Sequence, residues 1–81
     1  MKAGVIRKLA QTHDRGALDR AADTLAEGGE VPFEVGGDDD GERLTHLMLA
    51  ARVRGLVDDG ADLKEAFREI MTQVRGVISN D

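Results

Sequence analysis

Cysteine is absent from this sequence, and aromatic residues, proline and serine are nearly absent. Without a thiol, the chain has no disulfide, no thiolate zinc site and no cysteine nucleophile. The single serine, Ser79, is among the last three residues, so no serine, histidine and acid set is credible. No pair of groups with complementary acid and base roles can be identified. We therefore predict that the protein is not an enzyme and uses no cofactor.

The aromatic content and the charge both argue against nucleic acid as a partner. Phe33 and Phe67 are the only aromatic residues, and 16 acidic residues outweigh 11 basic ones to give a formal charge of −5. Binding a polyanion requires a basic patch, and binding single strands usually also requires aromatic side chains that stack on the bases. We expect no nucleic-acid partner.

Long hydrophobic runs are missing as well. The first eight residues are basic, but no apolar segment of signal-peptide length follows them, and no stretch is long enough to span a bilayer. The sequence predicts a cytoplasmic protein without a membrane partner.

What the sequence does contain is helical periodicity in four segments, at about residues 5–12, 14–27, 41–59 and 62–78. Asp14 is a good N-cap for the second segment, and Gly28 is placed to end it. Gly60 closes the third segment, and Asp62 begins the fourth with a capping box. The 81 residues are predicted to form one all-α domain, 1–81, a small bundle of three to four helices.

Residues 30–36, between the second and third helices, alternate acidic and apolar positions. This pattern predicts a short extended arm that lies across the helices and contributes Val31, Phe33 and Val35 to the core. Pro32 argues against a central strand. Whether the arm is a strand at all is left open.

The acidic loop that follows, Asp38, Asp39 and Asp40, could hold a cation or begin a helix. A calcium loop with Gly41 at its turn would place Gly36 and Leu47 at the first and last ligand positions, where neither has a side-chain ligand. A phosphate loop would need a lysine that is missing. Asp39 with Glu42 three residues later reads as a capping box, so helix capping is favoured over weak cation binding.

The third helix has two apolar arcs on opposite sides. The first contains Leu44, Leu47, Met48 and Ala51, and the second contains Leu49, Ala50, Val53, Leu56 and Val57. A surface helix of a small bundle usually shows one apolar stripe. A helix that is apolar nearly all round is either surrounded by the other helices and the arm of its own chain or meets a second chain with one arc. We favour the second arrangement, a homodimer whose interface is formed by Leu49, Val53, Leu56 and Val57, with Gly55 allowing close approach of a neighbouring backbone. Which arc faces the core is left open.

The fourth helix carries an apolar seam at Leu63, Phe67, Ile70, Val74 and Val77, which predicts packing along a neighbouring helix. Phe67 is expected in the core, where its replacement by alanine would cost about 3–5 kcal/mol. One flank of this helix is basic, with Lys64, Arg68 and Arg75 as candidate polar contacts for an acidic partner. The alternative is a solvated face with weak intrahelical ion pairs.

His46 lies in line with Ala50, Val53 and Val57 on the third helix. A lone histidine on an apolar face is usually packed and hydrogen-bonded, because a metal site or a general base needs convergent partners. A packed role is favoured, and a ligand role for His46 is the alternative.

Three stretches, "VIRKL", "GDDDGERLTHLMLAARV" and "DLKEAF…VRGVIS", together resemble a small bacterial family of helical proteins of about 80 residues that has no established function. The resemblance covers most of the chain. It implies a compact helical protein and assigns no activity and no site residues.

Two functional hypotheses follow from these observations. The first is a non-enzymatic interaction module, a small acidic homodimer that binds another protein, with the acidic loop 38–40 and the basic flank of the fourth helix setting its orientation. The alternative is a small-ligand or divalent-metal-binding protein that uses His46 and nearby acidic residues.

Overall fold

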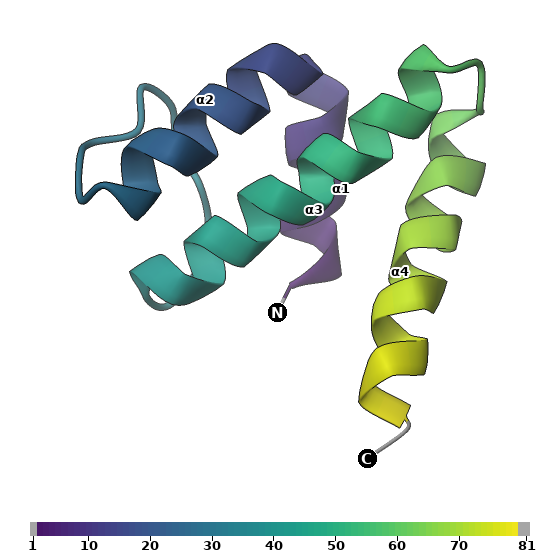
Figure 1. Ribbon diagram of the computed structural model, residues 1–81. Coiled ribbons are helices and arrows are strands. Elements are labelled where there is room, and N and C mark those ends of the chain that lie inside the picture. Colours follow the sequence, from purple (N-terminus) through teal and green to yellow (C-terminus); the bar gives the residue numbers. More distant parts are fainter. Residues whose placement is uncertain (1, 80–81) are drawn as a thin grey trace.

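The structure, a computed structural model, describes residues 2–79 (Figure 1). Side chains are described up to Val74. Its four helices are α1 (Ala3–Thr12), α2 (Arg15–Ala26), α3 (Asp40–Asp58) and α4 (Leu63–Ser79). Across this part of the chain there is no strand, which confirms the all-α class. The bounds agree with the predicted ones to within about two residues, so local sequence signals determine where each helix begins and ends.

Aspartates cap α2 and α3, as predicted. The Ala17 N–H donates to Asp14 Oδ1 at 2.7 Å, and the Glu42 N–H donates to Asp39 Oδ1 at 2.7 Å. Each bond satisfies one of the backbone donors that the first turn of a helix leaves without an intrahelical partner. α4 begins directly after Asp62.

Glycines end α2 and α3 by the same local mechanism. Gly28 has a φ of +84° and Gly60 a φ of +111°, which side chains of L-residues rarely allow. The next residue along folds back: the Gly29 N–H donates to the Thr24 carbonyl at 2.9 Å, and the Ala61 N–H donates to the Leu56 carbonyl at 3.0 Å. Both ends are Schellman motifs, so the glycine signals in the sequence had a physical basis.

α3 is the central helix and packs against all three others, while α1 touches α4 only slightly. In Figure 1, α3 crosses the middle of the molecule with α2 and α4 on either side of it and α1 behind. Residues of both predicted arcs are buried, among them Leu47 and Ala51 of the first arc and Leu49 and Val53 of the second. Both arcs of α3 therefore face the core of a single chain, which explains why it is apolar on opposite sides.

This placement corrects the expected role of Gly55. A Cβ at Gly55 would lie 2.9 Å from Arg15 Nη1, so the missing side chain makes room for an arginine of α2 rather than for a second backbone. Of the predicted interface residues, Leu49 and Val53 are buried within the chain, and Leu56 and Val57 are half-buried against the core. The homodimer stays a prediction, but Leu49 and Val53 are not available to its interface.

The arm of residues 30–36 is neither helix nor strand. Val35 is buried, Val31 and Phe33 pack partly buried against the core, and the Phe33 ring stacks on His13 with 3.8 Å between ring centroids. The arm therefore covers the helices with apolar side chains, as predicted, without the backbone pairing of a sheet.

Candidate functional site

An open groove of about 820 Å³ lies between α1 and α4. α1 contributes one side of the groove, with residues on three successive turns of the helix, and α4 with Asp62 just before it contributes the other. The lining residues are Ala3, Arg7, Gln11, Asp62, Leu63, Lys64, Phe67, Arg68, Met71 and Thr72. A volume of this size is in the range of pockets that bind small molecules.

The sequence of α1 explains why the groove stays open. Ala3, Arg7 and Gln11 are four residues apart and so lie along one side of the helix. One of these side chains is small and two are polar, and helices close onto each other through apolar side chains. The apolar stripe of α1, which includes Ile6 and Leu9, is buried in the core instead.

Phe67 and Met71, which are both half-buried, are the largest apolar side chains that line the groove, and they are called its floor below. This corrects the expectation that Phe67 is a core residue. Ala66 and Ile70 are the buried positions of α4, at 1% and 3% exposure. The cost expected for a fully buried phenylalanine therefore does not apply to Phe67.

Arg7 joins the two sides of the groove. Its Cζ atom lies 5.7 Å from the centroid of the Phe67 ring. At this distance the guanidinium is attracted to the negative face of the ring, an interaction worth about 0.5–1 kcal/mol at an exposed site. Arg7 therefore lies where it contacts the aromatic floor and where a bound molecule would meet it.

The charge of the groove is opposite in sign to that of the chain. Arg7, Lys64 and Arg68 face one lining carboxylate, Asp62, so the groove carries an excess of two positive charges in a chain with a formal charge of −5. Lys64 and Arg68 belong to the basic flank predicted for the fourth helix. The side chain of Arg75, the third predicted member, lies outside the described residues.

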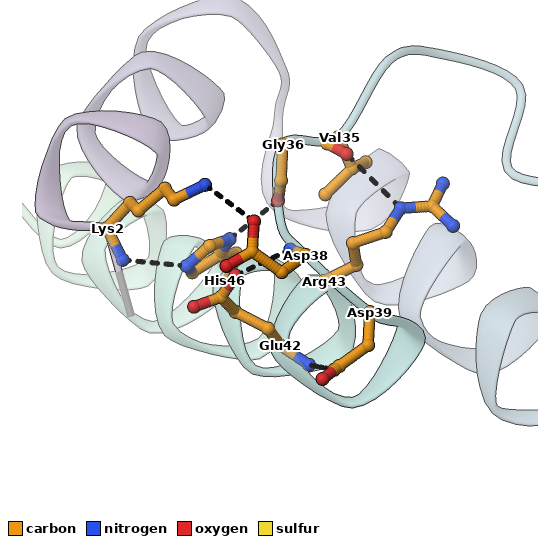
Figure 2. Close-up of polar contacts among 8 residues, drawn as sticks. All are labelled: Lys2, Val35, Gly36, Asp38, Asp39, Glu42, Arg43 and His46. Atoms are coloured by element: carbon orange, nitrogen blue, oxygen red, sulfur yellow. Dashed lines mark hydrogen bonds and ion pairs between the residues drawn. The ribbon is translucent and has the colours of Figure 1, made fainter.

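The acidic loop Asp38–Asp40 lies elsewhere, at the start of α3, where it meets positively charged neighbours (Figure 2). Lys2 Nζ lies 3.2 Å from Asp38 Oδ1, and Arg43 Nη1 lies 2.9 Å from Asp40 Oδ1. Asp39 caps the helix. Nowhere among the described residues do three or more histidine, cysteine or acidic side chains gather in a way that could hold a metal ion. The geometry of the loop is that of helix capping.

Glu42 completes a shifted capping box. In the usual box, the acid in the first turn accepts from the N–H of the N-cap residue. Here Glu42 Oε1 accepts from the Asp38 N–H, one residue before the cap, at 2.7 Å (Figure 2). A hydrogen bond with the amino-terminal ammonium group, followed by this bond from Asp38, lowers the pKa of the Glu42 carboxyl from 4.5 to about 2.

Replacing Glu42 by glutamine is expected to make the free energy of unfolding depend less on pH in the acidic range. A carboxyl whose pKa is lowered on folding contributes stability that is full above its unfolded pKa and is lost as the pH falls through its folded pKa. For Glu42 that window runs from pH 4.5 down to about 2. Urea unfolding at several pH values measures the effect, with Glu65→Gln as a control for removing one carboxyl. An unchanged pH slope in the Glu42 variant would contradict this role.

His46 is fully buried and hydrogen-bonded at both ring nitrogens (Figure 2). Nε2 accepts from the Lys2 backbone N–H at 3.0 Å, and Nδ1 lies 2.7 Å from the Gly36 carbonyl, to which it donates. This pair of bonds assigns a neutral ring with the proton on Nδ1. His46 joins the start of α1, the loop and α3, and it presents no free nitrogen to a metal or a substrate.

The loop beside His46 is held between α1 and α3. Arg43 Nε donates to the Val35 carbonyl at 3.2 Å. A Cβ at Gly36 would lie 2.9 Å from Val5 Cγ2, and a Cβ at Gly37, whose φ is +149°, would lie 2.7 Å from Arg43 Cγ. The glycine pair therefore lets the loop approach both helices closely enough for the Gly36 carbonyl to reach His46.

The structure thus separates the predicted polar residues into two groups. Lys64 and Arg68 line the groove, whereas Asp38, Asp39, Asp40 and His46 lie around the start of α3 and do not line it. Sequence reasoning missed the contribution of α1, above all Arg7. The regular spacing of Ala3, Arg7 and Gln11 was the available signal, although it does not show which helix they would face.

None of the described helices is both long enough and apolar enough to cross a membrane.

Comparison with known proteins identifies the family. The model of a family of unknown function, DUF6952, matches residues 1–79, and the chain belongs to this family. No curated protein and no solved structure is detectably similar to it. The membership agrees with the resemblance seen in the sequence, and it leaves the groove as the feature from which function is argued.

Proposed function

We propose that this member of DUF6952 is a non-enzymatic protein-interaction module that binds another protein in the groove between α1 and α4. The observation that supports the proposal is the half-buried floor of Phe67 and Met71 with cations beside it. Protein interfaces combine an apolar centre with a polar rim, and aromatic residues, methionine and arginine are enriched in them. The groove has this composition.

Other surfaces of the molecule support binding less well. Met48, at 55% exposure, is the one large apolar side chain that is more than half exposed among those the structure describes. Single exposed apolar side chains are normal on soluble proteins, whereas a cluster marks a contact surface. The alternative of metal or ligand binding through His46 has less support, because both nitrogens of its ring are hydrogen-bonded within the chain.

Reversing the charge of the groove is expected to abolish the binding of the partner protein. Proteins that are cross-linked to the tagged chain in cells are identified by mass spectrometry. The set found with the variant Lys64→Glu/Arg68→Glu should lack the proteins that bind at the groove. The fold should survive, because both side chains are exposed. In addition, Lys64→Glu places a negative charge in the first turn of α4, where it interacts favourably with the positive end of the helix dipole.

The matched control is Lys8→Glu/Arg20→Glu, which changes the net charge by the same amount at exposed positions outside the groove. Its cross-linked proteins should match those of the unmodified chain. A protein that is lost in both variants responds to net charge alone. If the groove variant and the unmodified chain give the same set, the groove is not the binding surface.

A further inference from the structure

Resting on the proposed function, we infer that the segment bound in the α1–α4 groove is a short amphipathic helix of the partner, apolar along one side and flanked by carboxylates. The inference assigns the partner by its chemistry. It is carried by the length of the groove, its apolar floor and the sign of its charge.

The shape of the groove fits a helix. Ala3, Arg7 and Gln11 line one side at a spacing of four residues, and on α4 Leu63 and Met71 mark a stretch of the same length. Eight residues of helix extend over about 12 Å, which is a little more than two turns. A helix docked in a groove of this kind is held by apolar anchors one turn apart. Phe67 and Met71 offer the surfaces on which such anchors pack.

The charge of the groove selects the flanks of that helix. Arg7, Lys64 and Arg68 would each meet a side chain at the edge of a docked helix. Carboxylates at these positions form ion pairs, whereas lysines would be repelled. Arg7 already lies against the Phe67 ring, so a carboxylate beside it joins an existing contact and does not have to order a free side chain.

A second copy of this chain is a poor occupant. Most dimers are two-fold symmetric, and a two-fold axis at the groove would place Arg7, Lys64 and Arg68 near their own copies. A head-to-tail contact would avoid this but would form open chains or rings. An anionic bilayer is disfavoured as well, because the chain as a whole carries a formal charge of −5 and the cations belong to a groove.

Designed peptides test the inference directly on the full chain. Three peptides of about 15 residues, long enough to form a helix, are compared. The first has leucines at helical spacing with glutamate flanks, the second has lysines in place of the glutamates, and the third is a scrambled version of the first. Amide chemical shifts of the isotope-labelled protein should move along the facing sides of α1 and α4 with the first peptide, and the other two should bind at least about tenfold more weakly.

The charge-reversed variant Lys64→Glu/Arg68→Glu supplies a reciprocal test that does not depend on loss of binding. It should bind the glutamate peptide about tenfold more weakly and the lysine peptide more tightly than the unmodified chain does. Raising the salt concentration should weaken both matched pairs, because exposed ion pairs are screened.

Each other outcome overturns either the inference or the proposed function on which it rests. Equal binding of the glutamate and lysine peptides would mean that binding depends on apolar contact and not on charge. Equal binding of the scrambled peptide would mean that the attraction is unspecific. Retention on phosphatidylserine vesicles that depends on Lys64 and Arg68 would mean that the groove binds a membrane surface and not a peptide. If no peptide binds while cross-linking in cells still depends on the groove, the proposed function stands and the partner class is wrong. If the peptides bind but no cross-linked protein depends on the groove, the proposed function fails instead.

Discussion

Replacing Leu47 by alanine is expected to lower the free energy of unfolding by about 2–5 kcal/mol. Leu47 is 0% exposed and lies in α3, the helix that packs against all three others. Removing its side chain leaves a cavity where the elements meet, and the backbone around it cannot collapse easily. A domain of this size is stable by about 4–12 kcal/mol, so the loss is a large share of the total. Urea unfolding followed by circular dichroism measures it.

Met48→Ala is the matched control, since it removes a long apolar side chain at the next position of the same helix. Met48 is 55% exposed. The change in helix propensity is similar for the two variants, so the difference between them reports burial. The control should change the free energy of unfolding by no more than about 0.5 kcal/mol. Equal losses for the two variants would mean that α3 is not inserted into the core as described.

The helices and their ends could be predicted from the sequence because the signals for them are local. Asp14 and Asp39 cap helices through bonds to residues three positions on, and Gly28 and Gly60 end helices through their own backbone angles. Such features need no knowledge of the rest of the chain. The position of the arm was predictable for a similar reason, since its alternating pattern contradicts a helix.

The packing of those helices depends on contacts between distant segments, and there the sequence was ambiguous. Two apolar arcs on α3 are consistent with a dimer and equally with one chain that covers both, and the second arrangement is the one observed. The apolar seam predicted for α4 included Phe67 and Ile70 but not Ala66. The helix is turned so that Ala66 and Ile70 face the core and Phe67 faces the groove, and periodicity determines a stripe without determining which edge of it meets a neighbour.

The groove was only half visible in the sequence for the same reason. Lys64 and Arg68 could be recognised as a basic flank, because one helix carries both. Arg7 comes from a helix more than 50 residues earlier in the chain, and it reaches the same site only because α1 and α4 both pack on α3. A flank of two cations is an ordinary solvated surface, whereas three cations that line a groove with a half-buried phenylalanine form a candidate binding site.

Replacing His46 by leucine is expected to cost about 2–5 kcal/mol of the free energy of unfolding, although leucine has a similar volume. The ring satisfies the Lys2 N–H and the Gly36 carbonyl, and an apolar side chain leaves both without this partner. A buried polar group that loses its hydrogen bond costs about 1–3 kcal/mol, and the upper end of the expected range is lower than twice that because the two bonds are partly buried. The same unfolding measurement applies, with His13→Leu as the control, because His13 is half-buried and contacts Phe33 through ring stacking.

Glutamine and asparagine at position 46 separate the two bonds. The glutamine side chain reaches as far as Nε2 and can accept from the Lys2 N–H, whereas the shorter asparagine reaches as far as Nδ1 and can donate to the Gly36 carbonyl. Each should therefore recover part of the stability lost with leucine. Long-range nitrogen–proton NMR correlations of the unmodified protein should show the proton on Nδ1. A proton on Nε2, or leucine that is tolerated as well as glutamine and asparagine, would mean that the ring does not join α1 to the loop, and His46 would again be a candidate ligand.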